Sequence, residues 1–112
     1  WDKVGAEPPA QAFDKVLRIA DKHNVALKWA HAPTMFDMPG YPNEGLRPFL
    51  RKALNAFGSE RIMWASDITA NQTGESWAEL LFAIRENPDL SQKEKEDILG
   101  RTARKWLKWE AL

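Results

Sequence analysis

Two groups with acid–base and metal-binding chemistry follow the two short apolar runs of this sequence. His31 comes directly after the run 25–30, and Asp67 comes directly after the run 61–66. An imidazole and a carboxylate are both ligands for zinc and manganese, and an ionised carboxylate can also accept a proton. If both runs are strands of one parallel sheet, His31 and Asp67 lie at the same edge, where the loops of βα folds converge. The pattern therefore predicts a candidate functional site at that edge.

Each of these residues also has a purely structural interpretation. An aspartate after a strand is about as often a turn former or helix cap as a functional group. A single histidine before a proline-rich loop, such as His31, can simply bind a nearby carbonyl oxygen. Two ligands are also fewer than the roughly three protein ligands of a catalytic metal site. A metal at this edge would need further ligands from outside these residues.

Helical patterns surround both candidate residues. Apolar residues recur at i, i+3, i+4 and i+7 in several parts of the chain, which is the spacing of one helix face. Ser76 with Glu79, and Ser91 with Glu94, fit capping boxes at helix starts, and Gly58 supplies a C-terminal stop. The predicted helices cover about 8–22, 46–57, 76–87, 91–99 and 102 to the C-terminus.

The segments between these helices predict two strands and a long loop. Residues 25–30 are apolar and β-prone, with Lys28 as their only charge, and residues 61–66 are apolar at consecutive positions. The second pattern is typical of a strand buried on both faces of a parallel sheet. The density of proline, glycine and asparagine in 32–45 predicts a loop without a helix. The order of elements indicates an α/β fold of βα units, and two strands alone would leave unpaired edges.

Composition limits the classes of function. The chain has 112 residues, which suits one domain, and its sixteen basic and sixteen acidic residues cancel, so no net charge favours nucleic acid or a membrane surface. No apolar run has the roughly 18 residues of a membrane span. The absence of cysteine excludes disulfides, thiolate zinc sites and a cysteine nucleophile, and it makes a cytoplasmic location the natural expectation. No phosphate loop, serine nucleophile elbow or zinc-protease motif is present.

Aromatic and basic residues give weaker signals. Trp29 and Trp64 lie in predicted strands, and Trp77 lies on an apolar helix face, which favours core packing over ligand stacking. Arg47 and Arg51 are one helical turn apart. This pair either binds a carboxylate or forms a solvated face, and the second role is the commoner one.

A family resemblance adds to these patterns. Residues 57–67, which read FGSERIMWASD, resemble the signature FGxxRxMxGSD near the end of amidohydrolase-related proteins. Residues 90–104, which read LSQKEKEDILGRTAR, resemble the closing segment LSxxEKxxILGxNAxR of the same proteins. Residues 25–28 are similar to the family's seventh strand, and residues 41–42 to the loop after it. The resemblance covers most of the chain from about residue 24 onward.

This resemblance implies a fold, an activity and a site. The family contains metal-dependent TIM-barrel hydrolases and decarboxylases, including enzymes similar to aminocarboxymuconate-semialdehyde decarboxylase. Residues 1–112 would be a single partial domain, the last two βα units and terminal helices of a (β/α)8 barrel. Asp67 would be the aspartate at the end of the eighth strand, a catalytic residue that binds the metal and accepts a proton. His31 matches no ligand position, while Ala65 in place of the usual glycine and Thr102 in place of asparagine remove no catalytic atom.

The implied partners follow from the same resemblance. The cofactor would be a divalent metal, zinc or alternatively manganese, and the substrate a small organic molecule whose contacts the sequence does not identify. Because the family's histidine ligands come from earlier strands, the rest of the barrel would be required for activity. The first residue is Trp1 rather than methionine, which fits a chain cut from a longer one.

Two other readings stay open. The chain could be a non-catalytic module whose strand edges and tryptophans dock onto another chain or onto copies of itself. A small flavodoxin-like domain fits less well, because only two strands are visible and no phosphate loop is present.

Overall fold

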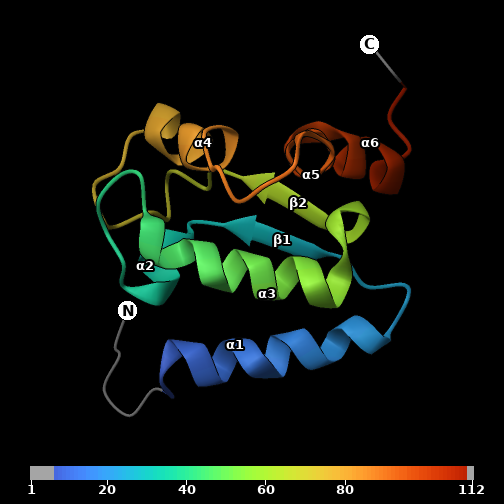
Figure 1. The fold of residues 1–112 in the computed structure, drawn as a ribbon, viewed down its shortest axis with the longest axis horizontal. Coiled ribbons are helices and arrows are strands. Elements are labelled where there is room, and N and C mark those ends of the chain that lie inside the picture. Colours follow the sequence, from blue (N-terminus) through green and yellow to red (C-terminus); the bar gives the residue numbers. More distant parts are fainter. Residues whose placement is uncertain (1–6, 111–112) are drawn as a thin grey trace.

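The structure, a computed structural model, describes residues 7–110 and contains a two-stranded parallel sheet packed against helices (Figure 1). Strands β1 (Leu27–Ala30) and β2 (Ile62–Ala65) pair in register over their whole length. The predicted parallel pairing is therefore confirmed, and both strands end at the same edge of the sheet.

Helices account for most of the remaining chain. Gly58, with a φ of 77°, ends the helix that precedes β2, as predicted. The final helical stretch is continuous but widens into a π-helical turn in its middle. The helical elements are α1 (Pro9–Arg18), η1 (Ile19–Asp21), α2 (Ala32–Phe36), η2 (Glu44–Leu46), α3 (Arg47–Phe57), η3 (Ser59–Arg61), α4 (Trp77–Arg85), α5 (Gln92–Glu96), η4 (Asp97–Arg101) and α6 (Thr102–Leu107).

Both predicted capping boxes are present. The Oγ atom of Ser76 accepts a hydrogen bond from the backbone N–H of Glu79 at 3.2 Å, and the Glu79 carboxylate accepts one from the backbone N–H of Ser76 at 3.1 Å. Ser91 and Glu94 form the same reciprocal pair at 3.1 and 2.9 Å. Each box satisfies two backbone donors that a helix start would otherwise leave unpaired.

The prediction of a loop without a helix over 32–45 is wrong. This segment contains α2, which begins directly after His31, and the short 3-10 turn η2. Pro33 is tolerated because it lies in the first turn of α2, where its missing N–H has no intrahelical acceptor. The helix stops at Asp37, whose φ of 54° is left-handed.

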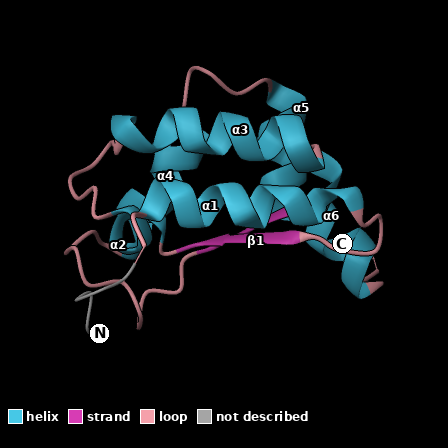
Figure 2. Ribbon diagram, turned by 90° about the horizontal axis from the view of Figure 1, so that it is seen from below, coloured by secondary structure: helices cyan, strands magenta, loops and turns pink. Residues whose placement is uncertain are grey.

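Helices cover one face of the sheet. Trp29 and Ile62 point to the same face and are buried, at 7% and 0% exposure, in the main core cluster. Figure 2 shows α1, α3 and α4 on the same side of β1. Lys28 and Met63, which alternate to the other face, are exposed and half-buried. The prediction that the second strand is buried on both faces is therefore not met by the described residues.

The core lies between the sheet and the helices. Its largest fully buried side chains are Leu50 of α3, Ile62 of β2 and Ile98 of η4. The predicted core position of Trp29 is confirmed, whereas that of Trp77 is wrong. Trp77 is 53% exposed, and its ring meets the edge of Trp64 with a centroid separation of 6.3 Å.

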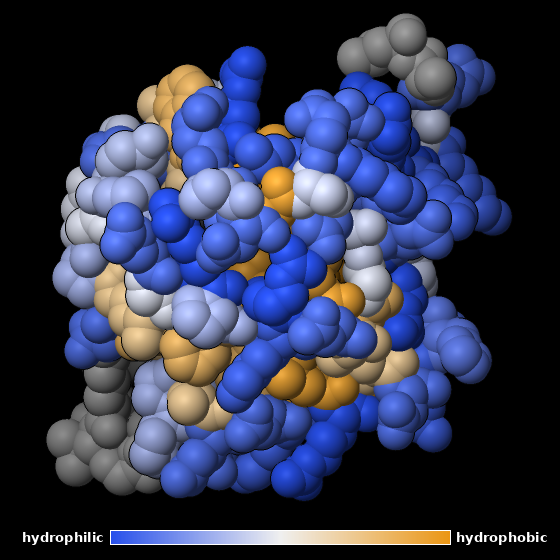
Figure 3. Space-filling model, viewed as in Figure 1, coloured by the Kyte–Doolittle hydropathy of each residue, from blue (hydrophilic) through white to orange (hydrophobic). Residues whose placement is uncertain are grey.

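The surface of the view in Figure 3 is mixed, with polar side chains interrupted by apolar ones over the middle of the molecule. Of the helices in residues 7–110, none has the length and apolarity needed to cross a membrane.

Candidate functional site

The structure brings His31 and Asp67 together at the carboxyl edge of the sheet. His31 follows β1 directly, and Asp67 lies two residues after β2. The Nδ1 atom of His31 is 2.6 Å from the Oδ2 atom of Asp67, and the two side chains are 23% and 28% exposed. The expectation that both residues meet at one edge is met, because in-register parallel strands carry them to the same level.

The contact between these two side chains is close but is not a hydrogen bond of normal geometry. His31 Nδ1 is buried and has no hydrogen-bond partner of good geometry among the described residues. The pair is an ion pair only when the imidazole is protonated. A buried polar atom that stays unsatisfied is rare in folded proteins, and His31 Nδ1 shares this state with Asn43 Oδ1 and Arg47 Nε among the described residues.

Backbone conformation sets the direction of both side chains. His31 has φ 36° and ψ 40°, and Asp67 has φ 46°, so both occupy the left-handed region. For a residue other than glycine this conformation costs about 1 kcal/mol or more and persists only where the surroundings enforce it. His31 is the residue that turns the chain from β1 into α2. Asp67 turns it out of β2, and its carbonyl oxygen accepts hydrogen bonds from the N–H groups of Ala70 and Asn71.

Glu75 was not singled out by the sequence patterns, yet it is the most perturbed carboxylate of the site region. It is 6% exposed and accepts hydrogen bonds on both oxygens. Burial alone would raise the pKa of Glu75, but hydrogen bonds from Thr73, Asn43 and Asn71 outweigh it and lower the pKa to about 2. The available signal was its position as the second acid, after Asp67, in a loop rich in amide and hydroxyl donors.

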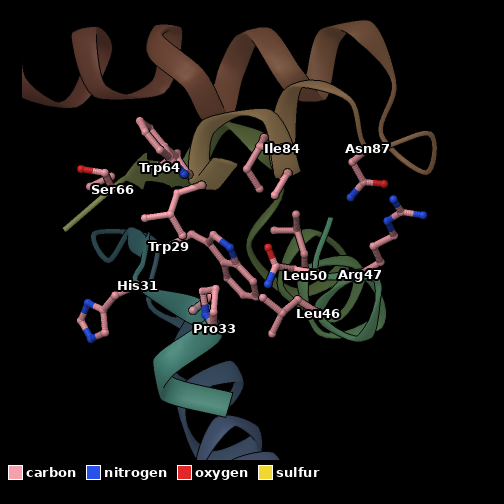
Figure 4. Close-up of a pocket in the computed structure, with 15 residues that line it drawn as sticks. Trp29, His31, Pro33, Leu46, Arg47, Leu50, Trp64, Ser66, Ile84 and Asn87 are labelled. Carbon is pink, nitrogen blue, oxygen red and sulfur yellow. The ribbon is translucent and has the colours of Figure 1, made fainter. Parts of the chain in front are cut away.

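A small cavity lies behind the pair, between the sheet and the helices (Figure 4). His31 and Ser66 lie at one border and Arg47 and Asn87 at the other, with the Trp29 ring between them. Its volume of ≈ 30 Å³ is enough for water but far below the several hundred Å³ of a ligand pocket. The described residues that line this cavity therefore do not enclose a space of ligand size.

The two arginines of the predicted pair behave differently. Arg51 binds both carboxylate oxygens of Glu94 at 2.8 and 3.1 Å and also donates to the carbonyl oxygen of Asp89. The carboxylate raises the pKa of Arg51, and the guanidinium lowers the pKa of Glu94. Arg51 thus joins α3 to the start of α5, which is a structural role. Arg47 lines the cavity, and its buried Nε has no partner among the described residues.

His31 and Asp67 at this edge are of residue types that bind divalent metals, but two side chains are too few for a complete metal site. Imidazole and carboxylate are suitable ligands for zinc or manganese. Within residues 7–110, however, no three His, Asp or Glu side chains gather closely enough to hold an ion. The described residues therefore do not form a complete metal site.

A parallel sheet with an acid–base pair at its carboxyl edge defines an α/β chain of the kind that carries functional groups there. The amidohydrolase family model matches residues 5–109, and the chain belongs to the amidohydrolase family. No curated protein and no solved structure matches the chain. Membership indicates a superfamily of metal-dependent hydrolases and decarboxylases, so the resemblance seen in the sequence is confirmed at the level of the family.

Proposed function

We propose that this chain is the C-terminal part of a (β/α)8 barrel enzyme, a metal-dependent hydrolase or carboxy-lyase that acts on a small organic substrate. The observation that carries the proposal is the position of Asp67. It ends the segment that resembles the family signature, follows a strand directly paired with β1, and lies 2.6 Å from His31. The family match over residues 5–109 supports the same assignment.

The open face of the sheet supports a larger fold. Lys28 is exposed and Met63 is half-buried on the face that points away from the core cluster, and each strand has one unpaired edge within the described residues. Parallel sheets are stable when both faces are covered and their edges are paired. Closure into a barrel of typically about 250 residues would meet both requirements. By itself, this chain would then be inactive.

In this proposal Asp67 is both a metal ligand and a proton acceptor. A divalent ion, zinc or manganese, would polarise a substrate carbonyl and lower the pKa of water. Asp67 would hold it together with donors from outside the described residues. His31, in contact with Oδ2, would fix the orientation of the carboxylate.

The test is the substitution Asp67→Asn in the protein that contains this chain. The expected result is a loss of at least about a hundredfold in kcat, the range for removal of an acid–base group, with less bound metal and unchanged thermal unfolding. Asp21→Asn, which changes an exposed aspartate, serves as the matched control. Near-normal activity of the Asp67 variant would remove this residue from the mechanism.

A second candidate is a non-catalytic module that docks onto another chain or onto copies of itself. The exposure of Trp77 and Trp109, at 53% and 63%, together with the open sheet face, favours it. Size-exclusion chromatography tests this candidate. A defined self-assembly or a defined complex with another chain would support the docking module, and a chain that stays monomeric and binds no other chain would contradict it.

A further inference from the structure

Glu75 lies in the loop after β2, which also carries Asp67, and its carboxylate reaches the segment that follows α2, the helix that begins after His31. Its Oε1 atom accepts hydrogen bonds from the backbone N–H of Gly40 at 2.9 Å and from Nδ2 of Asn43 at 3.0 Å, both in the loop after β1. Its Oε2 atom accepts from Asn71 at 3.2 Å and from Thr73, both in the loop after β2. One carboxylate therefore joins residues 40–43 to residues 71–73.

No cation compensates this buried charge among the described residues. A carboxylate taken out of water is stable only when hydrogen bonds replace its hydration. Four donors from two loops do this for Glu75, and loss of any donor would leave part of the charge unsatisfied. The hydrogen bonds that stabilise the Glu75 carboxylate therefore also hold the two loops together.

Asn71 extends the connection towards the His31 and Asp67 pair. While its Nδ2 donates to Glu75, its Oδ1 accepts from Oγ1 of Thr34 at 2.9 Å. Thr34 lies in α2, which begins directly after His31, and its Oγ1 also accepts from the backbone N–H of Gln72 at 2.8 Å. The backbone N–H of Asn71 in turn donates to the carbonyl of Asp67.

We propose that Glu75 is a positioning residue, whose carboxylate holds the two loops together so that His31 and Asp67 stay in contact in their left-handed conformations. The strained backbone at both residues requires enforcement from its surroundings, and the hydrogen-bond chain from Glu75 through Asn71 to Thr34 supplies it. Its consequence for catalysis rests on the function proposed above, whereas its consequence for the geometry does not.

The test uses Glu75→Gln in the protein that contains this chain. The replacement has the same shape, but its NH2 group faces donors whichever way the amide is turned. We expect amide hydrogen exchange to accelerate about tenfold at Gly40, the loss of roughly one hydrogen bond to a charged group. We also expect about the same acceleration at Gln72 and loss of the nuclear Overhauser contact between the His31 ring and the Asp67 β-protons.

The distant signals separate positioning from local structure. Glu75 does not bond to Gln72 or to His31, so acceleration at Gly40 alone, with the His31 to Asp67 contact retained, would overturn the proposal. The control is Glu44→Gln, which changes an exposed glutamate of η2, near Gly40 in the sequence, and should alter neither signal.

A swap provides rescue. The double variant Asn71→Asp with Glu75→Gln exchanges amide and carboxylate, so that the new amide donates to the new carboxylate and Thr34 still has an acceptor. Exchange rates should return to within about threefold of the original chain, and failure to improve on Glu75→Gln would contradict the hydrogen-bond chain.

If Glu75→Gln does not fold, the variant Asn71→Ala provides a second test. It removes the hydrogen bonds that link Glu75 to Thr34, and it should still abolish the contact between His31 and Asp67. A retained contact would overturn the proposal.

Measuring kcat and KM provides an independent test of the proposal. In an active protein containing this chain, Glu75→Gln should lower kcat about tenfold with little change in KM, because it disorders the pair without removing a substrate contact. If Asp67→Asn leaves activity intact, the proposed function fails, while the exchange and Overhauser measurements still decide the role of Glu75.

Discussion

The two ends of the sheet use polar side chains in different ways. At the amino end, the Arg61 guanidinium donates to the backbone carbonyl oxygens of Phe57, Ala20 and Lys22, each at 3.0 Å. The Thr102 hydroxyl donates to the carbonyl of Ser59 at 2.6 Å in the same region. Three donor atoms, Arg61 Nε, Arg61 Nη1 and Thr102 Oγ1, make these four hydrogen bonds, and all four go to backbone carbonyls.

At the carboxyl end, polar side chains face one another. His31 contacts Asp67, Glu75 collects donors from two loops, and His31 and Asp67 have left-handed backbones. Groups that satisfy backbone carbonyls contribute stability, whereas groups held in strained positions beside each other remain free for chemistry. The comparison predicts that substitutions at the amino end act mainly on folding, and that substitutions of His31 and Asp67 at the carboxyl end act mainly on local geometry and activity. Glu75 is the exception at the carboxyl end, because its buried charge also contributes to stability.

The largest expected effect on stability is at Arg61. Arg61→Met keeps most of the alkyl stem but removes the donors to backbone carbonyls of α3, η1 and the connection that follows η1. It should lower the free energy of unfolding by about 3 kcal/mol. Urea unfolding with an unchanged m value would measure it. Arg85→Met, at an exposed position of α4, should change stability by less than about 0.5 kcal/mol.

This first prediction also tests the division between the ends. Arg61→Met should leave the Overhauser contact between His31 and Asp67 intact in the folded state. A stability loss below about 1 kcal/mol would contradict the stabilising role of Arg61. Loss of the contact between His31 and Asp67 in a folded variant would show that the two ends of the sheet are coupled.

The fold could be predicted where local signals decide the structure. The strands, the capping boxes at Ser76 and Ser91, and the stop at Gly58 depend on neighbouring residues, and all are present. The density of helix breakers in 32–45 does not predict α2, because Pro33 is compatible with a helix only through its position in the first turn. Helix periodicity shows that Trp77 shares a face with apolar residues, but it does not show whether that face is covered.

The site could be predicted only in part for a related reason. Parallel register brings any two residues that follow paired strands to one edge, so the proximity of His31 and Asp67 follows from the pattern of strands. The partners Gly40 and Asn43 of Glu75 lie 35 and 32 positions away, and no local spacing encodes their approach. Long-range hydrogen bonds in loops depend on how the loops fold, which periodicity does not describe.

Acidification should weaken the carboxyl end through Glu75. Its pKa is about 2 in the folded chain against an ordinary 4.5, so its contribution to stability is complete above about pH 4.5 and is lost as the pH falls towards 2. The difference in unfolding free energy between the original chain and Glu75→Gln should therefore shrink by about 2 kcal/mol between pH 6 and pH 2. Urea unfolding at several pH values would measure this difference.

A matched substitution at the amino end keeps this measurement specific. Burial would raise the pKa of Asp97, but hydrogen bonds from Lys93 and Ser59 outweigh it and lower the pKa, so acid also weakens the amino end. Asp97→Asn should remove that part of the pH dependence and leave the Glu75 part in place. Parallel curves for the original chain and Glu75→Gln would contradict the low pKa of Glu75.

The smallest expected effect separates the two ends with a single hydroxyl group. Thr102→Val removes the donor to the Ser59 carbonyl while keeping the shape of a side chain that is 2% exposed. Because the carbonyl then lacks this buried partner, the free energy of unfolding should fall by about 1 kcal/mol, measured by urea unfolding. Thr69→Val makes the same change at an exposed position of the loop after β2 and should stay within about 0.5 kcal/mol of the original chain. Equal losses from both variants would mean that hydroxyl groups at the amino end do not have a special role in stability, and the contrast between the ends would then rest on Arg61 alone.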